Sequence, residues 1–457
     1  DEEPIAQRVS AIVDDPRFKA ARWGIHVVDV ATGDVVYSRD AGRRFLPASN
    51  MKLYTTALAL ARLGPAYRWR TSVYAAAKPG RNGRIAGDLI VYGRGDPTFS
   101  ARFGTAGAHA RIDALADAIA ATGARVVSGS LVADESFFKG VRLGYGWEWN
   151  DLQWAYGAEV SALSVGDNAI ELTVVPGRKV GDTCVVTVGD DAGYVRVINK
   201  TRTAPAGEKN SLGVYRAEGS NTVELWGRMP IGAAFDDPVA VHDPAGLFGR
   251  LLRDALARRN VVVRGAVKTV DSRMRDDVPL DTSRFVELAF TESEPLSAVV
   301  AVTNHVSQNL YAELLLRSVG RAFGPRDAES AEAAGTAVLL EYLKSAGIDI
   351  GPLAFSDGSG LSRSNLVTPE ATVGLLTYVR GQSYGDLFFQ SLPGPGSDGT
   401  MEKRFLDTMI VGKLRAKTGT LGDVSALSGY LETRSGRTLA FSIMVNNEPD
   451  DVKQLRR

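Results

Sequence analysis

The most constraining feature of the sequence is a run of strong helix formers that follows directly after a serine and a lysine. Residues 53–63 are rich in Ala and Leu, which have high helix propensity. Pro47 before this run is a helix-start signal, and Gly64 after it is a stop signal. The pattern predicts a buried helix with Ser49 at or near its first turn. Lys52 then lies one turn further along, on the same face.

This serine–lysine spacing suits nucleophilic catalysis. A serine hydroxyl attacks a carbonyl only when a base takes its proton, and a lysine serves as that base when its pKa is lowered. The first turn of a helix adds amide donors and a positive dipole end where an oxyanion would form. Alone, Ser-x-x-Lys more often marks a helix-capping serine followed by a solvated lysine, so its meaning depends on motifs further along the chain.

The composition restricts the class of protein. The chain has 457 residues, which is enough for two to four domains. It carries 53 Lys+Arg and 53 Asp+Glu, and this zero net charge argues against a nucleic-acid partner. No apolar run reaches the roughly 18–20 residues of a membrane-spanning helix. Residues 1–4 have no signal-peptide character, so this end reads as either a cytosolic terminus or a mature chain after signal removal.

The sequence contains no motif for a cofactor. Its four histidines are scattered, and no His-Glu-x-x-His, Cys-x-x-Cys, EF-hand or glycine-rich nucleotide loop is present. We therefore expect neither a metal site nor another cofactor. The single cysteine, Cys184, lies in a strand-like run, which favours a buried structural thiol.

Helical and strand patterns alternate along the chain. The middle of the sequence, residues 168–225, has short strands between turns and predicts a small all-β module. The elements predicted near the two ends are a helix over 5–20, a hairpin over 23–37, a helix over 326–346 and a hairpin over 425–445.

Two more motifs follow Ser49 and Lys52 in a fixed order. Ser-Gln-Asn at residues 307–309 interrupts an apolar helical stretch, and Lys-Thr-Gly at residues 417–419 lies on a predicted strand. Alone, the first fits a helix cap and the second a surface strand before a turn. Together, in this order and in these elements, the three motifs are typical of penicillin-binding proteins and related β-lactamases.

On these motifs the chain resembles the class C low-molecular-mass penicillin-binding proteins, the D-alanyl-D-alanine carboxypeptidases and endopeptidases of bacterial cell walls. The similarity extends beyond the motifs to nearly the whole chain. The further segments that match are residues 87–100, 157–164, 357–363, 392–394 and 398–400.

The resemblance implies an α/β (α+β) multidomain fold. Its core is a transpeptidase-like domain with an antiparallel sheet flanked by helices, and a large inserted region contains the small all-β module. The expected division is a catalytic domain at 1–70 and 288–457, an inserted α/β domain at 71–165 and 242–287, and a nested β domain at 166–241.

The resemblance also implies catalytic roles. Ser49 would be the acylated nucleophile, Lys52 its neutral base, and Ser307 the relay that passes a proton to the leaving D-alanine amine. From the residue types alone, we expect Lys417 beside Lys52 to lower the pKa of the base by like-charge repulsion.

Other matching residues would bind the substrate. Asn309 would hold the substrate amide and Lys52, and Lys417 and Thr418 would bind the terminal carboxylate and support the positive field. Gly419 would let the substrate backbone approach the strand. The N–H groups of Ser49 and Thr420 would form the oxyanion hole.

An aromatic and acidic pocket is expected for the amine-bearing end of the peptide. The candidates are Asp151 with Trp147 or Trp149, from a dense aromatic loop, and Leu421 after the third motif. Aromatic and acidic side chains together suit an amine-bearing ligand. A loop packed onto a neighbouring core is the alternative interpretation of the aromatic residues.

These assignments predict a serine DD-peptidase that acts on peptidoglycan stem peptides and is acylated by β-lactams, either as a carboxypeptidase or as an endopeptidase. They imply an exported, periplasmic or extracytoplasmic protein without a transmembrane segment, and they are compatible with a homo-oligomer. The alternatives are a β-lactamase, which is usually compact and lacks so large an insertion, and a non-catalytic cell-wall-binding protein, which has no need for both lysines. The insertion also disfavours a cytosolic esterase.

Overall fold

The computed structural model describes residues 4–104 and 107–447. The chain divides into two compact units, one made of residues 1–67, 144–146 and 295–457 and the other of residues 68–143 and 147–294. Residues 1–3, at the end read as a mature terminus, lie outside the described part. In that part, no helix has the length and apolar character needed to cross a membrane.

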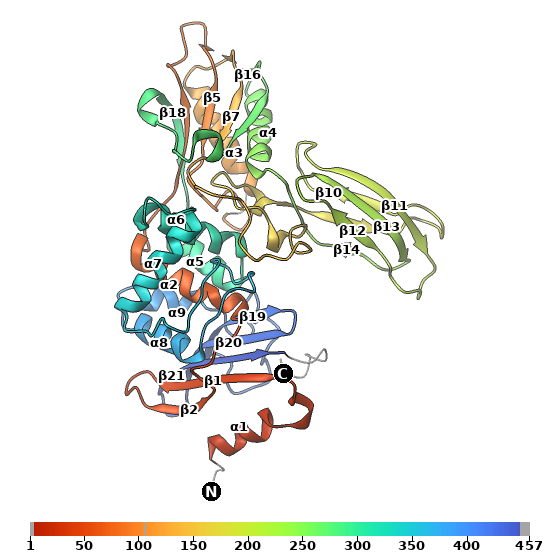
Figure 1. The fold of residues 1–457 in the computed structure, drawn as a ribbon. Helices are drawn as coiled ribbons and strands as arrows, with labels where there is room; N and C mark the ends of the chain where they lie inside the picture. Colours follow the sequence, from red (N-terminus) through yellow and green to blue (C-terminus); the bar gives the residue numbers. More distant parts are fainter. Residues whose placement is uncertain (1–3, 105–106, 448–457) are drawn as a thin grey trace. The chain divides into compact units, whose positions relative to one another are not determined.

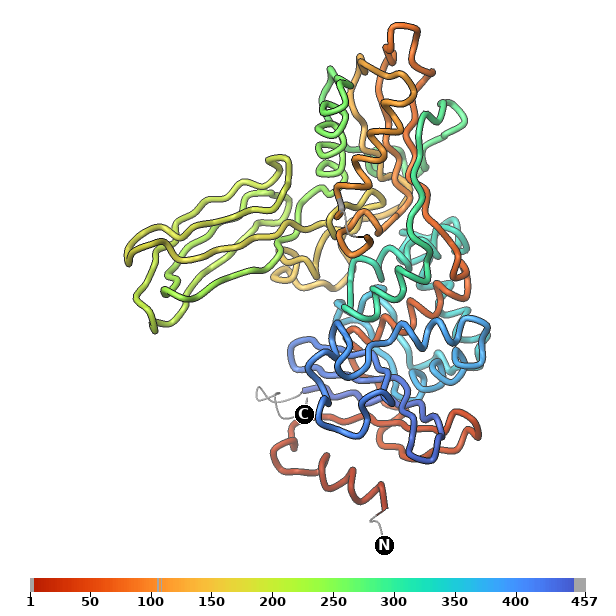
Figure 2. Tube along the Cα trace, turned by 180° about the vertical axis from the view of Figure 1, so that it is seen from behind, coloured from red at the N-terminus to blue at the C-terminus, as the bar shows by residue number. Residues whose placement is uncertain are grey.

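The first unit is built on a five-stranded antiparallel sheet that joins both ends of the chain. Its order is β19-β20-β21-β1-β2, and Figures 1 and 2 show the red N-terminal strands beside the blue C-terminal ones. The third motif therefore lies on the edge strand β19. The strands are β1 (Arg22–Asp29), β2 (Val35–Arg39), β19 (Leu414–Leu421), β20 (Val424–Glu432) and β21 (Thr438–Asn446).

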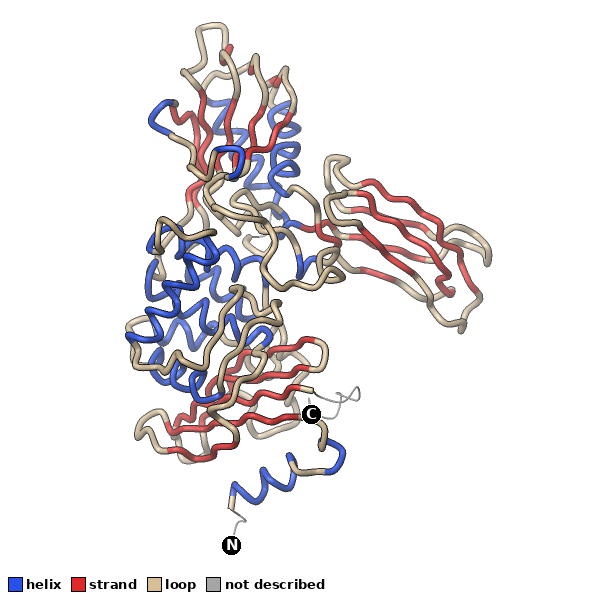
Figure 3. The backbone as a smooth tube through the Cα atoms, in the orientation of Figure 1, coloured by secondary structure: helices blue, strands red, loops and turns tan. Residues whose placement is uncertain are grey.

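Helices pack together on this sheet, with α2 at their centre. The residues of α2 from Met51 to Leu60 are all buried, because the helix contacts α5, α6, α7 and α9 while α8 covers β1, β20 and β21. Figure 3 shows the helices of this unit other than α1 gathered beside its sheet, while α1 lies apart from them near the N-terminus. The helices are α1 (Ile5–Val13), α2 (Met51–Leu63), α5 (Leu296–His305), α6 (Asn309–Phe323), α7 (Ala331–Ser345), α8 (Pro369–Arg380) and α9 (Gly385–Ser391).

Two helices of the first unit are shorter than the sequence pattern predicted. The first ends at Val13, because Asp15 accepts the Arg17 N–H and begins a separate 3₁₀ turn at Pro16. The residue before a proline is disfavoured in a helix. The helix predicted over 326–346 begins only after Ser330, whose hydroxyl accepts the Ala333 N–H as an N-cap.

The second unit has a mixed five-stranded sheet with the order β17-β7-β5-β3-β18, and a small parallel sheet with the order β16-β6-β4. Helices α3 and α4 contact each other and share a buried core with these strands. The elements are β3 (Arg70–Ala75), β4 (Arg84–Ile85), β5 (Leu89–Tyr92), α3 (Gly107–Ala121), β6 (Val126–Val127), β7 (Leu131–Asp134), α4 (Pro244–Arg258), β16 (Val262–Val263), β17 (Val267–Val270) and β18 (Val286–Glu292).

The predicted all-β module forms part of the second unit. Two three-stranded sheets, β10-β9-β14 and β11-β13-β12, share one apolar core. Cys184 is buried in that core, which confirms the expected structural thiol. The separation of this module from the inserted domain, with the boundaries given above, stays a prediction. The strands are β8 (Ala169–Ile170), β9 (Leu172–Val175), β10 (Val185–Val188), β11 (Arg196–Ala204), β12 (Gly213–Arg216), β13 (Thr222–Pro230), β14 (Phe235–Asp236) and β15 (Val239–Ala240).

Candidate active site

Ser49 lies in a strained turn at the start of α2. The 3₁₀ turn Ala48–Asn50 leads directly into the helix, and Ala48 has a φ of 46°. A left-handed residue other than glycine costs about 1–3 kcal/mol and persists only where its surroundings hold it. Here Asn50 donates a 2.7 Å hydrogen bond from Nδ2 to Ser428 Oγ, which ties the turn to β20. The sequence therefore places its candidate nucleophile in a fixed, locally strained position.

Lys52 is fully buried and contacts Ser49 directly. Its Nζ lies 2.9 Å from Ser49 Oγ, 2.6 Å from Asn309 Oδ1 and 2.7 Å from the Ser359 carbonyl oxygen. Burial lowers the pKa of Lys52 to about 7, while the charges of Asp357 and Glu313 act in the opposite direction. A lysine with this pKa exists substantially as a neutral amine at neutral pH, which is the form that accepts a proton.

The second and third motifs meet each other. Ser307 lies between α5 and α6 with a φ of 62°, and the Gln308 side chain caps α6 by accepting the Leu310 N–H. Lys417 Nζ donates to Ser307 Oγ and to the Thr418 carbonyl oxygen, both at 2.9 Å. The Lys417 side chain thereby joins β19 to the break before α6.

Both lysines have lowered pKa values, and burial is the largest cause for each. The pKa of Lys417 is lowered well below its usual range by burial and then by repulsion from Lys52. At Lys52, burial is the dominant cause of the lowered pKa, and Lys417 is not among the causes. Repulsion between the two lysines is thus present, as expected, but burial is the dominant cause of the lowered pKa of Lys52. Desolvation among the helices lowers the pKa of Lys52, and the charge of Lys52 contributes to the lowered pKa of Lys417.

Gly419 allows β19 to approach the nucleophile turn. A Cβ at this position would lie 2.7 Å from the Pro47 carbonyl oxygen and 3.1 Å from Ser49 N, so a larger residue would push the strand away. Thr418 is half-buried, Thr420 is exposed and Leu421 ends the strand. The structure thus brings together Ser49, Lys52, Ser307, Asn309, Lys417 and the strand residues 418–421 in the first unit.

Of the residues predicted to form an aromatic and acidic pocket, Trp147, Trp149 and Asp151 belong to the second unit and Leu421 to the first. Trp149 is 77% exposed, and Asp151 accepts a 3.1 Å hydrogen bond from the Tyr156 hydroxyl. Their contribution to the site, with Trp147, stays a prediction.

Sequence reasoning missed three residues around Lys52: Ser359, Asp357 and Glu313. Residues 357–363 had matched the family pattern without a role. A signal for Glu313 was present, since it lies four residues after Asn309 and therefore on the same face of α6.

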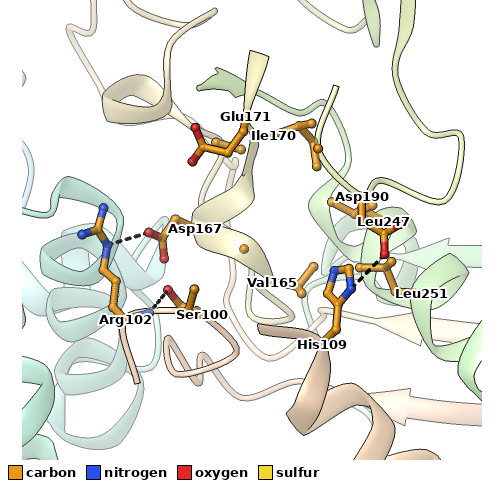
Figure 4. Close-up of a pocket in the computed structure, with 14 residues that line it drawn as sticks. Ser100, Arg102, His109, Val165, Asp167, Ile170, Glu171, Asp190, Leu247 and Leu251 are labelled. Atoms are coloured by element: carbon orange, nitrogen blue, oxygen red, sulfur yellow. Dashed lines mark hydrogen bonds and ion pairs between the residues drawn. The ribbon is translucent and has the colours of Figure 1, made fainter. Parts of the chain in front are cut away.

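A separate cavity of about 550 Å³ lies in the second unit. Figure 4 shows Arg102 paired with Asp167 on one side and His109 beside Asp190 on the other, with atom separations of 2.8 and 3.2 Å. Ser100 also lines this cavity, and its hydroxyl accepts a hydrogen bond from the Arg102 backbone N–H. These polar groups form ion pairs and a turn, whereas those of the first unit surround a serine and a buried amine. Within the described residues, no cluster of His, Cys, Asp and Glu could hold a metal ion.

Comparison with known proteins agrees with the geometry of the first unit. The model of the D-Ala-D-Ala carboxypeptidase 3 (S13) family matches residues 5–457. The chain belongs to this family. It is a serine-type hydrolase, a class C low-molecular-mass penicillin-binding protein and DD-peptidase, as the order of the three motifs predicted.

Individual relatives cover most of the chain. A D-alanyl-D-alanine carboxypeptidase of Actinomadura sp. (strain R39) is 38% identical over 462 residues, which span 97% of this chain and 81% of the relative. The crystal structure of penicillin binding protein 4 from Haemophilus influenzae has a TM-score of 0.84 at 23% identity, covering 97% of this chain and 94% of that chain. The same protein complexed with a β-lactam has a TM-score of 0.78 at 21% identity, covering 98% and 95%. The likeness to these structures confirms the predicted fold class.

Proposed function

We propose that Ser49 is the nucleophile and Lys52 the general base of a DD-peptidase acting on peptidoglycan stem peptides. The neutral amine of Lys52 takes the Ser49 proton as Oγ attacks the carbonyl of the penultimate D-alanine. The bond to the terminal amine then breaks, and the proton returns to that amine through Ser307. Water hydrolyses the resulting ester and frees the serine.

The single observation that carries this proposal is the contact between Lys52 and Ser49. Their 2.9 Å separation is within hydrogen-bond reach, and the pKa of Lys52, lowered to about 7, leaves a neutral amine available. Neither property is needed by a protein that only binds cell wall.

Substrate binding is assigned to the neighbouring motifs. Lys417 and Thr418 would receive the terminal carboxylate, and Asn309 would hold the substrate amide. The N–H groups of Ser49 and Thr420 would donate to the oxyanion. A Cβ added to Gly419 would lie only 3.1 Å from Ser49 N. This close approach of β19 to the nucleophile supports the assignment of substrate binding to the strand.

Three finer features complete the proposal. Trp147, Trp149, Asp151 and Leu421 would recognise the amine-bearing end of the stem peptide, as the residue types suggest. The enzyme would be exported, because its substrate is outside the membrane. β-Lactams would acylate Ser49, and the β-lactam complex of the Haemophilus influenzae protein, which has the same fold, supports this reaction.

Labelling with a fluorescent penicillin tests the proposal, with the adduct located by mass and Ser49→Ala as the control. We expect a lasting adduct on Ser49 that is absent from the variant. Rapid hydrolysis of the penicillin without an adduct would instead indicate a β-lactamase, and no reaction at all would contradict the assignment of Ser49. Release of D-alanine from a pentapeptide, compared with cleavage of a cross-linked peptide dimer, then distinguishes carboxypeptidase from endopeptidase activity.

A further inference from the structure

Residues 358 and 359 are clamped between two helices beside the candidate base. On one side, their carbonyl oxygens accept hydrogen bonds from α2: Thr55 Oγ1 donates to Gly358 at 2.7 Å and Lys52 Nζ to Ser359 at 2.7 Å. On the other side, their N–H groups donate to a single atom of α6, Glu313 Oε1, at 3.0 and 2.8 Å. The peptide group between residues 358 and 359 is therefore held from both sides, and Ser359 is held by Glu313 at its N–H and by Lys52 at its carbonyl.

The rest of the loop is built around Asp357. Its carboxylate accepts the N–H groups of Gly360 and Ser362 at 2.8 and 2.7 Å and the side-chain amide of Asn365 at 2.7 Å. Gly360 has a φ of 86°, and a Cβ there would lie 1.8 Å from the carbonyl oxygen of Ala48. The loop thus packs against the residue before Ser49 with no room for a side chain.

The acceptors around Lys52 define the direction of its lone pair. A neutral amine has two N–H groups and one lone pair. Asn309 Oδ1 and the Ser359 carbonyl, at 2.6 and 2.7 Å, are the partners that cannot donate. They take the two N–H groups, so the lone pair faces the third neighbour, the Ser49 hydroxyl at 2.9 Å. A base arranged in this way accepts the serine proton without first rotating.

We propose that Glu313 is a positioning residue for the general base: it fixes the Ser359 carbonyl, which in turn directs the Lys52 lone pair at Ser49. Helix α6 then controls both oriented contacts of the lysine, directly through Asn309 and, one turn later, through Glu313. This inference rests on the proposed function, because it assumes that Lys52 acts as the base.

The surroundings of Glu313 suit a structural hydrogen-bond acceptor. The residue is fully buried, and within the described residues its Oε2 has no hydrogen-bond partner. Burial, with the neighbouring charges of Asp357 and Glu332, raises the pKa of Glu313 to about 8. Oε1 can accept both N–H groups whether the carboxyl group is protonated or ionised. A glutamine keeps the same acceptor, whereas a leucine of similar size removes it.

The test measures acylation of Ser49 by a penicillin, separating the first-order rate at saturation from the dissociation constant of the initial complex. We expect Glu313→Leu to acylate about 100-fold more slowly per labelled site, as a small misplacement of a catalytic group does, with the dissociation constant unchanged. Glu313→Gln should stay within about threefold of the wild type. Thr55→Val, which releases only the Gly358 carbonyl, should lose about two- to tenfold, the effect of one hydrogen bond.

The matched control is Glu332→Gln, in the same buried cluster. Glu332 pairs with Arg317 at 3.0 Å, whereas the N–H groups of residues 358 and 359 donate to Glu313, so the rate of this variant should match the wild type. A wild-type rate in both Glu313→Leu and Thr55→Val would overturn the inference, as would an equal loss in Glu332→Gln. If Glu313→Leu does not fold, Thr55→Val carries the test alone. Failure of the wild type itself to form an adduct would instead contradict the proposed function.

Discussion

The two buried lysines of the site, one on α2 and one on β19, differ in their surroundings. Both side chains are fully shielded from solvent. Lys52 feels the charges of Asp357 and Glu313, which oppose the effect of burial on its pKa and leave it at about 7. For Lys417 the causes are burial and repulsion from Lys52, and both lower its pKa. Among the described residues, no carboxylate pairs with it.

This difference indicates a division of labour between two identical side chains. Lys52, with partly compensated burial, is poised between its protonated and neutral forms at neutral pH, as a general base requires. Lys417 has no compensating anion among the described residues. A carboxylate on the ligand would supply it and raise the pKa of Lys417, so substrate binding and protonation would be coupled there.

Replacement of Lys52 should have the largest effect. Lys52→Met is expected to slow acylation of Ser49 by about 10²- to 10⁴-fold, because the base is lost. Lys52→Arg should be equally slow, since a guanidinium stays protonated. The measurement is the acylation rate by penicillin at pH 8. An active arginine variant would mean that Lys52 supplies charge rather than basicity.

The pH dependence of the wild type should report the same group. Because the neutral form of Lys52 is the proposed base, the acylation rate should rise with pH through about 7, by about tenfold per unit below that value. Stopped-flow acylation between pH 5 and 9 measures this. A rate that falls as the pH rises through 7 would show that a protonated acid controls acylation. That result would contradict the role of Lys52.

Replacement of Lys417 should depend on the ligand. Lys417→Ala is expected to reduce kcat/KM about 10- to 100-fold for a peptide with a free terminal carboxylate, the worth of a hydrogen bond to a charged group. The same peptide with a terminal amide should lose much less. Equal losses of kcat/KM for the two peptides would show that Lys417 does not bind the terminal carboxylate.

The smallest expected effect is on stability, and its sign distinguishes Lys417 from an ordinary lysine. Lys417→Met should raise the free energy of unfolding by about 1–2 kcal/mol, because it removes a buried group without a counter-charge. Unfolded lysine has a pKa of about 10.4. Between that value and the lowered folded pKa the unfolded chain binds an additional proton, so the wild type loses stability as the pH falls.

The gain in Lys417→Met should therefore be larger at pH 7 than at pH 10, measured by denaturant unfolding. The matched control is Lys413→Met, whose side chain is only half-buried just before β19, and whose effect should stay within about 0.5 kcal/mol. A pH-independent gain in Lys417→Met would contradict the lowered pKa.

The sequence predicted the site better than it predicted its surroundings. Three short motifs sufficed to select Ser49, Lys52 and Lys417, because their chemistry requires particular residue types at particular spacings. Helices α8 and α9 were not predicted, although Thr368 caps α8 and Pro369 begins it. Their apolar residues contact the sheet and α5 rather than forming a strong local pattern.

The electrostatics of the site could not be predicted from the chain alone. The pKa of Lys52 depends on burial among helices and on Glu313 and Asp357, which lie more than 250 residues further along the sequence. Lys417 lies even further along the chain, but the third motif placed it in the site, whereas no motif assigned a role to Glu313 or Asp357. The role of residues 357–362 was missed for the same reason, since their partners are on α2 and α6.

The pairing of β1 with β21 has a consequence for how the enzyme matures. β1 joins β21 along its whole length, from Arg22 opposite Asn446 to Asp29 opposite Leu439, and β21 separates the first hairpin from β19. A nascent chain therefore carries its nucleophile without the completed sheet until residues 438–446 have been made. Closing so long a loop is slow. A chain interrupted before Thr438 would carry Ser49 and Lys417 but would lack the strand that joins β1 to β20.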